Sequence, residues 1–165
     1  VDDLMRTNVP GIYALGDCAG NQLLAHKAMH EGVICVEAIA GQGHGSVDYR
    51  NVPNCTYCHP EVASVGLAEE EALDEGHEIE VGKFPWVGNG RAITVGHTEG
   101  FVKVIRDKKY SEMLGAHIVG PQAPTLVQQL IQGMAAGLTV DQMAHDQLYI
   151  HPAMPELVEQ ALLDL

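Results

Sequence analysis

The sequence predicts an α+β fold in which an antiparallel sheet is flanked by helices and preceded by a short βα unit. Two apolar runs with β character, 101–106 and 113–119, flank Asp107-Lys108-Lys109-Tyr110, a pattern typical of a β-hairpin. A long amphipathic helix then spans the apolar positions between Leu126 and Met134 and is closed by Gly137. At 165 residues, with 46% hydrophobic and 19% charged residues, the chain can bury a core of ordinary size.

The first region is predicted to be the βα unit. The apolar run 11–15 ends at Gly16-Asp17, as expected for a buried parallel strand running into a loop, and a helix is expected from about Leu23 to Ala40. Its packing face is predicted to comprise Leu24, Ala28, Gly32, Cys35 and Ile39. The loop between such a strand and helix can bind a nucleotide, because the amides at a helix N-terminus favour negative charge on the ligand. A Gly-Asp turn with a plain capping role is the alternative.

The glycine-rich stretch 41–46 predicts a boundary between a first domain, 1–46, and a second, 47–165. In the second domain we expect a short β run over 60–66, a helix from Glu69 to Glu75 and a strand from Glu78 to Trp86. The segment 139–142 has capping-box form and predicts another short helix.

Charge restricts the function classes. A net charge of −13 argues against nucleic acid or an anionic membrane as partner, and favours a basic protein partner. The acidic run 69–71 by itself is better interpreted as a solvated helix face. No apolar run is long enough to span a bilayer and no signal peptide is evident, so a cytoplasmic location is expected. Because the chain opens at Val1 without an initiator Met, we expect a segment of a longer protein.

The pattern Cys55-Thr56-Tyr57-Cys58-His59 matches c-type haem attachment, half of a zinc site and a redox CxxC. Its context favours none of them, since no second ligand pair has comparable spacing and a short β run follows directly. We therefore expect two reduced cysteines beside a strand and no metal site.

His151-Pro152-Ala153-Met154-Pro155-Glu156 is the strongest candidate for chemistry. Pro152 favours an extended His151, while Pro155 suits the first position of the helix over 156–163. His151 can then lean back towards a carboxylate in the first helical turn, which would orient the imidazole and favour the imidazolium of a general base. A surface histidine preceding a helix is the simpler alternative.

Six motifs in order resemble the C-terminal part of the FAD-dependent pyridine nucleotide-disulfide oxidoreductases. Thr7 to Asp17 is similar to the second FAD-contacting motif, and Leu23-Leu24-Ala25-His26-Lys27-Ala28 resembles the segment beneath the flavin, in the form found in the dihydrolipoamide dehydrogenase branch. The remaining motifs resemble the dimerisation domain: 60–66, 89–92, 114–120 and the terminal His-Pro-x-x-x-Glu.

The resemblance implies a role for each site residue. His151 would take a proton from dihydrolipoamide and Glu156 would orient and charge-balance its ring, acting on the flavin and disulfide of the opposite subunit in a homodimer. Asp17 would hydrogen-bond a ribityl hydroxyl of FAD. Backbone amides around Leu23, Leu24 and Ala25 would stabilise negative charge on the reduced flavin.

The chain also departs from the family pattern. Ala153, Pro155 and Tyr149 stand where Thr, Ser and His are commonest, which we interpret as subfamily variation. The first FAD motif, the Cys-x4-Cys disulfide and the NAD domain are absent, so FAD and NAD would belong to the parent enzyme and the isolated chain is expected to be inactive. Expected partners are dihydrolipoamide on an acyltransferase or carrier protein and a basic subunit-binding domain. A non-catalytic module for dimerisation and for docking on such a domain is the alternative function.

Overall fold

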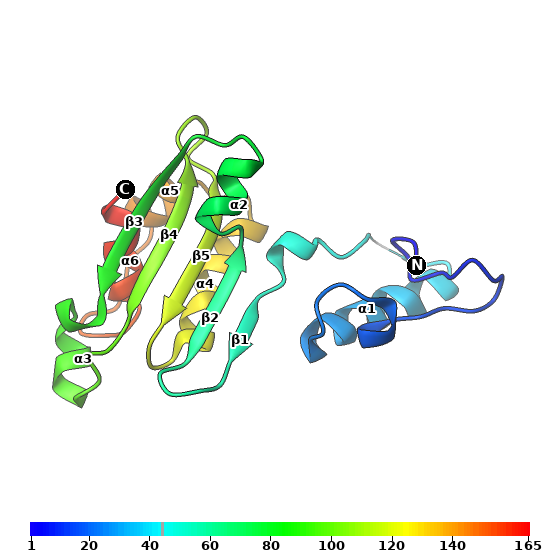
Figure 1. The fold of residues 1–165 in the computed structure, drawn as a ribbon, viewed down its shortest axis with the longest axis horizontal. Helices are drawn as coiled ribbons and strands as arrows, with labels where there is room; N and C mark the ends of the chain where they lie inside the picture. Colours follow the sequence, from blue (N-terminus) through cyan, green and yellow to red (C-terminus); the bar gives the residue numbers. More distant parts are fainter. Residues whose placement is uncertain (44) are drawn as a thin grey trace. The chain divides into compact units, whose positions relative to one another are not determined.

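The computed structural model describes residues 1–43 and 45–165, which form two compact units, Val1–Val52 and Pro53–Leu165 (Figure 1). His44, in the predicted linker, lies outside the described residues. The contacts divide the chain between Val52 and Pro53, whereas the sequence predicts the domain boundary between residues 46 and 47, and that boundary stays a prediction.

The first unit is built around α1 (Ala25–Ile39), with the short 3-10 helices η1 (Gly16–Ala19) and η2 (Tyr49–Asn51). The helix confirms the one expected from Leu23 to Ala40, with ends displaced by one or two residues. The strand predicted over 11–15 is wrong. In this segment only Tyr13 forms a bridge, an antiparallel one to Arg6, because the chain doubles back on itself at Val9 instead of meeting a parallel neighbour.

The buried face of α1 also differs from the prediction. Its buried residues are Lys27, Glu31, Ile34 and Cys35; of these only Cys35 was predicted, and Ile39, also predicted, is 59% exposed. Leu24, Ala28 and Gly32 are half-buried, so the apolar periodicity identified part of the packing face. It missed Lys27 and Glu31, because charged residues one turn apart are usually a solvated surface pair.

The second unit contains a five-stranded antiparallel sheet in the order β1-β2-β5-β4-β3. The predicted hairpin is confirmed, with a register shift between Ile105 and Arg106. The short run expected over 60–66 forms β2 and the strand expected from Glu78 to Trp86 forms β3. The strands are β1 (Asn54–Thr56), β2 (Val62–Gly66), β3 (Ile79–Pro85), β4 (Phe101–Asp107) and β5 (Met113–Val119).

Helices cover both faces of this sheet (Figure 1). On one face lie α4 (Ala123–Ala135), α5 (Val140–His145) and α6 (Glu156–Leu163), and α2 (Glu69–Asp74) lies on the other. These four helices confirm the predicted ones, including the capping box in which Gln142 N donates to Thr139 Oγ1. Two further short helices, η3 (Trp86–Gly88) and α3 (Gly90–Val95), have no counterpart among the predicted elements.

The main core lies between the sheet and helices α4 to α6. Alternate residues of β4, Val102 and Val104, face these helices, whereas Ile105 joins Ala72 and Leu114 in a smaller cluster under α2. Gly82 lets α6 approach the sheet closely, since a Cβ there would collide with the carbonyl oxygen of Ala161. This close packing on β3, together with the hydrogen bond from the Lys83 amide to the Asp164 carboxylate, holds α6 and therefore Glu156 in place.

Candidate functional site

His151 and Glu156 form the hydrogen-bonded pair that the sequence predicts. Nδ1 of His151 lies 2.6 Å from Oε1 of Glu156. The imidazole sits before α6 and is 80% exposed, while the carboxylate belongs to the first helical turn and is 21% exposed. With Nδ1 donating to the carboxylate, Nε2 of a neutral ring carries the free lone pair, so it can accept a proton from outside.

Glu156 is held at both of its oxygens. Its Oε2 accepts a hydrogen bond of 2.8 Å from the backbone amide of Ala153, which closes the turn between the two partners. The hydrogen bond from His151, helped by that from the Ala153 amide, lowers the pKa of the Glu156 carboxyl below its ordinary value. Glu156 is therefore a carboxylate at neutral pH, as an orienting partner for an imidazole must be.

Asn89 connects this turn to the rest of the unit. The sequence places it in the motif 89–92 of the dimerisation domain but did not predict this contact. Its Nδ2 donates to the carbonyl of Ala153 at 3.0 Å, and its Oδ1 accepts from the amide of Ala92 at 2.9 Å, capping α3. The residue is 3% exposed. Because Asn is a favoured N-cap residue, Asn89 itself was the available indication that a helix begins at the next residue.

Two exposed apolar residues lie within the three positions that precede His151 in the sequence. Leu148 is fully exposed and Ile150 is 74% exposed, directly before His151. Isolated exposed apolar residues are common, but two of them next to an exposed histidine mark a surface suited to a protein contact.

The predicted cofactor-contacting residues all lie in the first unit. Asp17 is exposed in η1, and Leu23, Leu24 and Ala25 lie at the start of α1. Leu24, the N-cap, provides no side-chain acceptor, and no acidic residue occupies the first turn. Without a side-chain cap, the first amides of α1 can donate to a group that carries negative charge, and the exposed Asp17 carboxylate can accept from hydroxyl groups.

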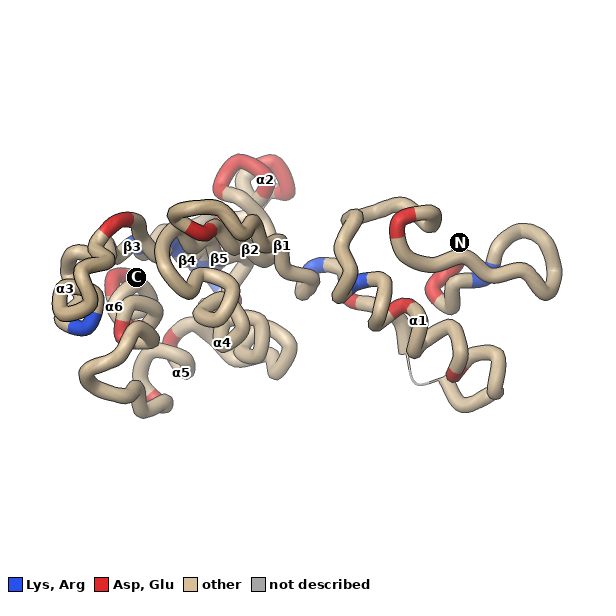
Figure 2. Tube along the Cα trace, turned by 90° about the horizontal axis from the view of Figure 1, so that it is seen from below, with Lys and Arg blue, Asp and Glu red and all other residues tan. Residues whose placement is uncertain are grey.

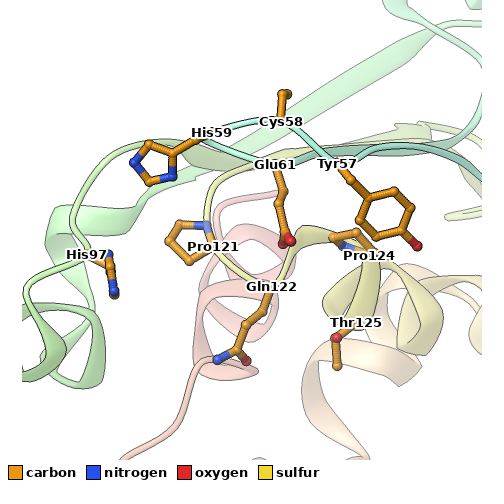
Figure 3. Close-up of a pocket in the computed structure, with 9 residues that line it drawn as sticks. All are labelled: Tyr57, Cys58, His59, Glu61, His97, Pro121, Gln122, Pro124 and Thr125. Atoms are coloured by element: carbon orange, nitrogen blue, oxygen red, sulfur yellow. The ribbon is translucent and has the colours of Figure 1, made fainter.

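A hollow of about 530 Å³ opens at the start of α4 in the second unit (Figure 3). Figure 3 shows Glu61 reaching from the β1–β2 turn towards Gln122 and Pro124. The lining residues are Tyr57, Cys58, His59, Glu61, His97, Pro121, Gln122, Pro124 and Thr125. None of the predicted catalytic or cofactor-contacting residues lines it. Within residues 1–43 and 45–165, no group of three or more His, Cys, Asp and Glu side chains is arranged to hold a metal ion.

Two protein-family models match the chain. The pyridine nucleotide-disulphide oxidoreductase dimerisation domain matches residues 52–162, which include His151, Glu156 and Asn89. The chain belongs to the pyridine nucleotide-disulphide oxidoreductases. A second model of this family matches residues 1–32, the segment that holds Asp17 and the start of α1.

The curated relatives are dihydrolipoyl dehydrogenases. The chain is 48% identical over 164 residues to that of Rhizobium etli, covering 99% of the chain and 34% of the relative. It is 43% identical to dihydrolipoyl dehydrogenase 1, mitochondrial, of Arabidopsis thaliana, covering 99% of the chain and 32% of the relative. The chain thus spans about a third of the length of the relatives it matches.

Solved structures share the fold. LpdA from Mycobacterium tuberculosis superposes with a TM-score of 0.91 at 28% identity, over 99% of this chain and 35% of LpdA. The HOCl-induced flavoprotein disulfide reductase RclA of Escherichia coli, in a Cu(II) complex, gives a TM-score of 0.88 at 31% identity, over 99% of this chain and 37% of RclA.

Proposed function

We propose that this chain is the C-terminal segment of an FAD-dependent dihydrolipoamide dehydrogenase, in which it supplies the His151–Glu156 acid/base pair. The observation that carries the proposal is the 2.6 Å contact between His151 Nδ1 and Glu156 Oε1, with Nε2 left exposed. Its second support is the 48% identity to a dihydrolipoyl dehydrogenase over nearly the whole chain.

His151 would act as the general base. A dihydrolipoamide thiol, with an ordinary pKa of about 8.5, is mostly protonated at neutral pH. Transfer of its proton to Nε2 leaves a thiolate, the form that attacks a disulfide sulfur. The carboxylate of Glu156 would keep the ring oriented and balance the charge of the imidazolium.

The pair would serve a second subunit. A dimerisation-domain match covering residues 52–162 implies a homodimer. The exposure of His151, Leu148 and Ile150 supports a role for this surface in the subunit contact, because a base that acts within its own subunit would not need apolar flanks open to solvent.

The cofactors would bind the parent enzyme, with part of the FAD site in this chain. Asp17 would accept from a ribityl hydroxyl, and the amides around Leu23, Leu24 and Ala25 would face the pyrimidine end of the flavin. FAD would supply electron transfer between the dithiol and NAD. On this account the chain alone does not complete the reaction.

The substrate assignment is tested on the complete flavoenzyme that contains this chain. Dihydrolipoamide with NAD should be turned over, and oxidised glutathione with NADPH, the substrates of another branch of the family, should not. Activity with the glutathione pair and none with dihydrolipoamide would refute the assignment while leaving the family membership intact.

A docking role is the second candidate, with dihydrolipoamide carried on an acyltransferase or carrier protein. Figure 2 shows acidic residues gathered on α2, and the chain carries a net charge of −13, which suits a basic subunit-binding domain. Binding of such a domain should weaken steeply with added salt; salt-independent or undetectable binding would remove this idea.

A cytoplasmic location stays a prediction, and some relatives are named as mitochondrial proteins. Among the described residues, no helix is long and apolar enough to cross a membrane.

A further inference from the structure

Lys27 and Glu31 form an ion pair inside the first unit. They lie one turn apart on α1, their side chains have no exposed surface, and Nζ is 3.1 Å from Oε1. Charged side chains are almost never this buried unless something specific holds them, since removing two charges from water costs several kcal/mol for each. Lys27 lies in the motif that resembles the segment beneath the flavin, but the sequence predicts no role for either side chain.

The ammonium group of Lys27 uses all of its donors. Besides Glu31, it donates to the carbonyl oxygens of Gly16 at 3.1 Å and of Gly20 at 2.7 Å. These two carbonyls stand at the two ends of the turn that contains Asp17.

The carboxylate of Glu31 holds the same turn from the other side. Its Oε2 accepts from the amide of Gly16 at 2.7 Å, and its Oε1 accepts from the hydroxyl of Tyr49 at 2.7 Å. Burial would raise the pKa of Glu31, but hydrogen bonds from Tyr49, the Gly16 amide and Lys27 outweigh it and lower the pKa. Glu31 is therefore ionised beneath the turn.

The geometry points to a positioning role. We propose that the Lys27–Glu31 pair fixes the Asp17 turn against the start of α1, so that the Asp17 carboxylate and the amides around Leu23 to Ala25 are held in one arrangement for FAD. The inference rests on the proposed function, which assigns both elements to the flavin site. Gly16, with φ of +68° and its Cα facing Ala28, permits the close approach that this arrangement needs.

A stability role alone explains the pair less well. Replacing a buried ion pair by apolar residues of similar size is often neutral or stabilising, so such a pair is weak evidence for stability. Among the described residues, the side-chain hydrogen bonds that leave the pair go to Gly16, Gly20 and Tyr49, so the pair specifies where the turn lies.

The test compares FAD affinity among variants of the complete flavoenzyme. Glu31→Gln keeps the size of the side chain, but its NH₂ group, itself a donor, must face either the Gly16 amide or the donors of Tyr49 and Lys27. At least one of these hydrogen bonds is therefore lost. We expect FAD to bind about tenfold more weakly or worse, the scale of a lost charge-assisted hydrogen bond. Tyr49→Phe should weaken FAD binding less, in the same direction. Glu80→Gln, which breaks the ion pair of Glu80 with Arg106 in the second unit, is the matched control and should not change FAD affinity.

A double variant separates positioning from folding. Lys27→Met with Glu31→Leu leaves no unpaired charge, so it should fold, with a circular dichroism spectrum like that of the parent enzyme, yet still bind FAD weakly. FAD binding of parental strength in both Glu31→Gln and the double variant would overturn the inference. Asp17→Ala distinguishes the two proposals: if it too leaves FAD affinity unchanged, the flavin-site assignment fails, whereas if it alone weakens binding, only the positioning role fails.

Discussion

Oε1 of Glu156 lies 2.6 Å from Nδ1 of His151, and its second oxygen closes the turn through the amide of Ala153. One carboxylate thus shapes the backbone and orients the ring. The exposed imidazole carries the chemistry in our account, and the carboxylate behind it determines which nitrogen faces outwards.

Glu156→Gln should lower kcat for dihydrolipoamide oxidation about tenfold to a hundredfold in the complete enzyme, because the imidazolium loses its charge partner. The amide can still accept from Ala153, so the fold and the bound FAD should be retained. Steady-state kinetics with a flavin absorption spectrum measure both. Glu159→Gln, on the same helix, should have the kcat of the wild type, and equal loss in both variants would argue against a specific role for Glu156.

Asn89→Ala should loosen the turn that carries the pair. It leaves the Ala153 carbonyl and the Ala92 amide without their partner, which should cost about 1–3 kcal/mol in the free energy of unfolding. The value of kcat should fall while KM for dihydrolipoamide changes little. Urea unfolding and steady-state kinetics test this. Asn54→Ala, on the exposed edge strand β1, is the control, and an unchanged kcat in Asn89→Ala would show that the turn holds its geometry without Asn89.

Leu148→Ser and Ile150→Ser should weaken the dimer. Light scattering on the 165-residue chain should give about 35 kDa for the unmodified protein, twice its 17.7 kDa, and a smaller mass for the variants at low concentration. Leu73→Ser, at an exposed position on α2, should leave the dimer intact. Dimers of equal strength in all of these proteins would place the subunit contact elsewhere.

Acid should destabilise the second unit through His117. Burial, with a smaller contribution from Lys103, lowers the pKa of His117, against the opposing effect of its 3.1 Å contact with the Leu67 carbonyl. Below the ordinary histidine pKa of about 6.5, the unfolded chain therefore binds more protons than the folded one. The free energy of unfolding decreases as the pH falls from there towards the lower pKa of His117 in the folded protein. The urea midpoint should drop between pH 7 and 5.5, and less so in His117→Gln. An identical drop in the variant would contradict this assignment.

The second unit was largely predictable because its patterns are local. Apolar runs with β character on both sides of Asp107 to Tyr110 define the hairpin. Pro155 with a first-turn carboxylate allowed the His151–Glu156 contact to be predicted. The short helix α3 escaped prediction, since Gly90 and β-branched residues within it have low helix propensity, and only the Asn89 cap favours it.

The first unit was harder to predict because its organisation depends on contacts between residues distant in sequence. The run 11–15 has strand composition, but a strand also needs neighbours, and only Tyr13 pairs, with Arg6. The burial of Lys27 and Glu31 follows from the position of Gly16, Gly20 and Tyr49, which no periodicity reveals.

The rate of flavin reduction by dihydrolipoamide in His151→Gln tests the central claim most directly. In stopped-flow experiments on the complete enzyme, we expect reduction to slow at least about a hundredfold with FAD still bound, as the loss of a general base requires. His145→Gln, an exposed histidine on α5, should reduce its flavin at the wild-type rate. Flavin reduction in His151→Gln as fast as in the wild type would contradict the assignment of His151 as the base.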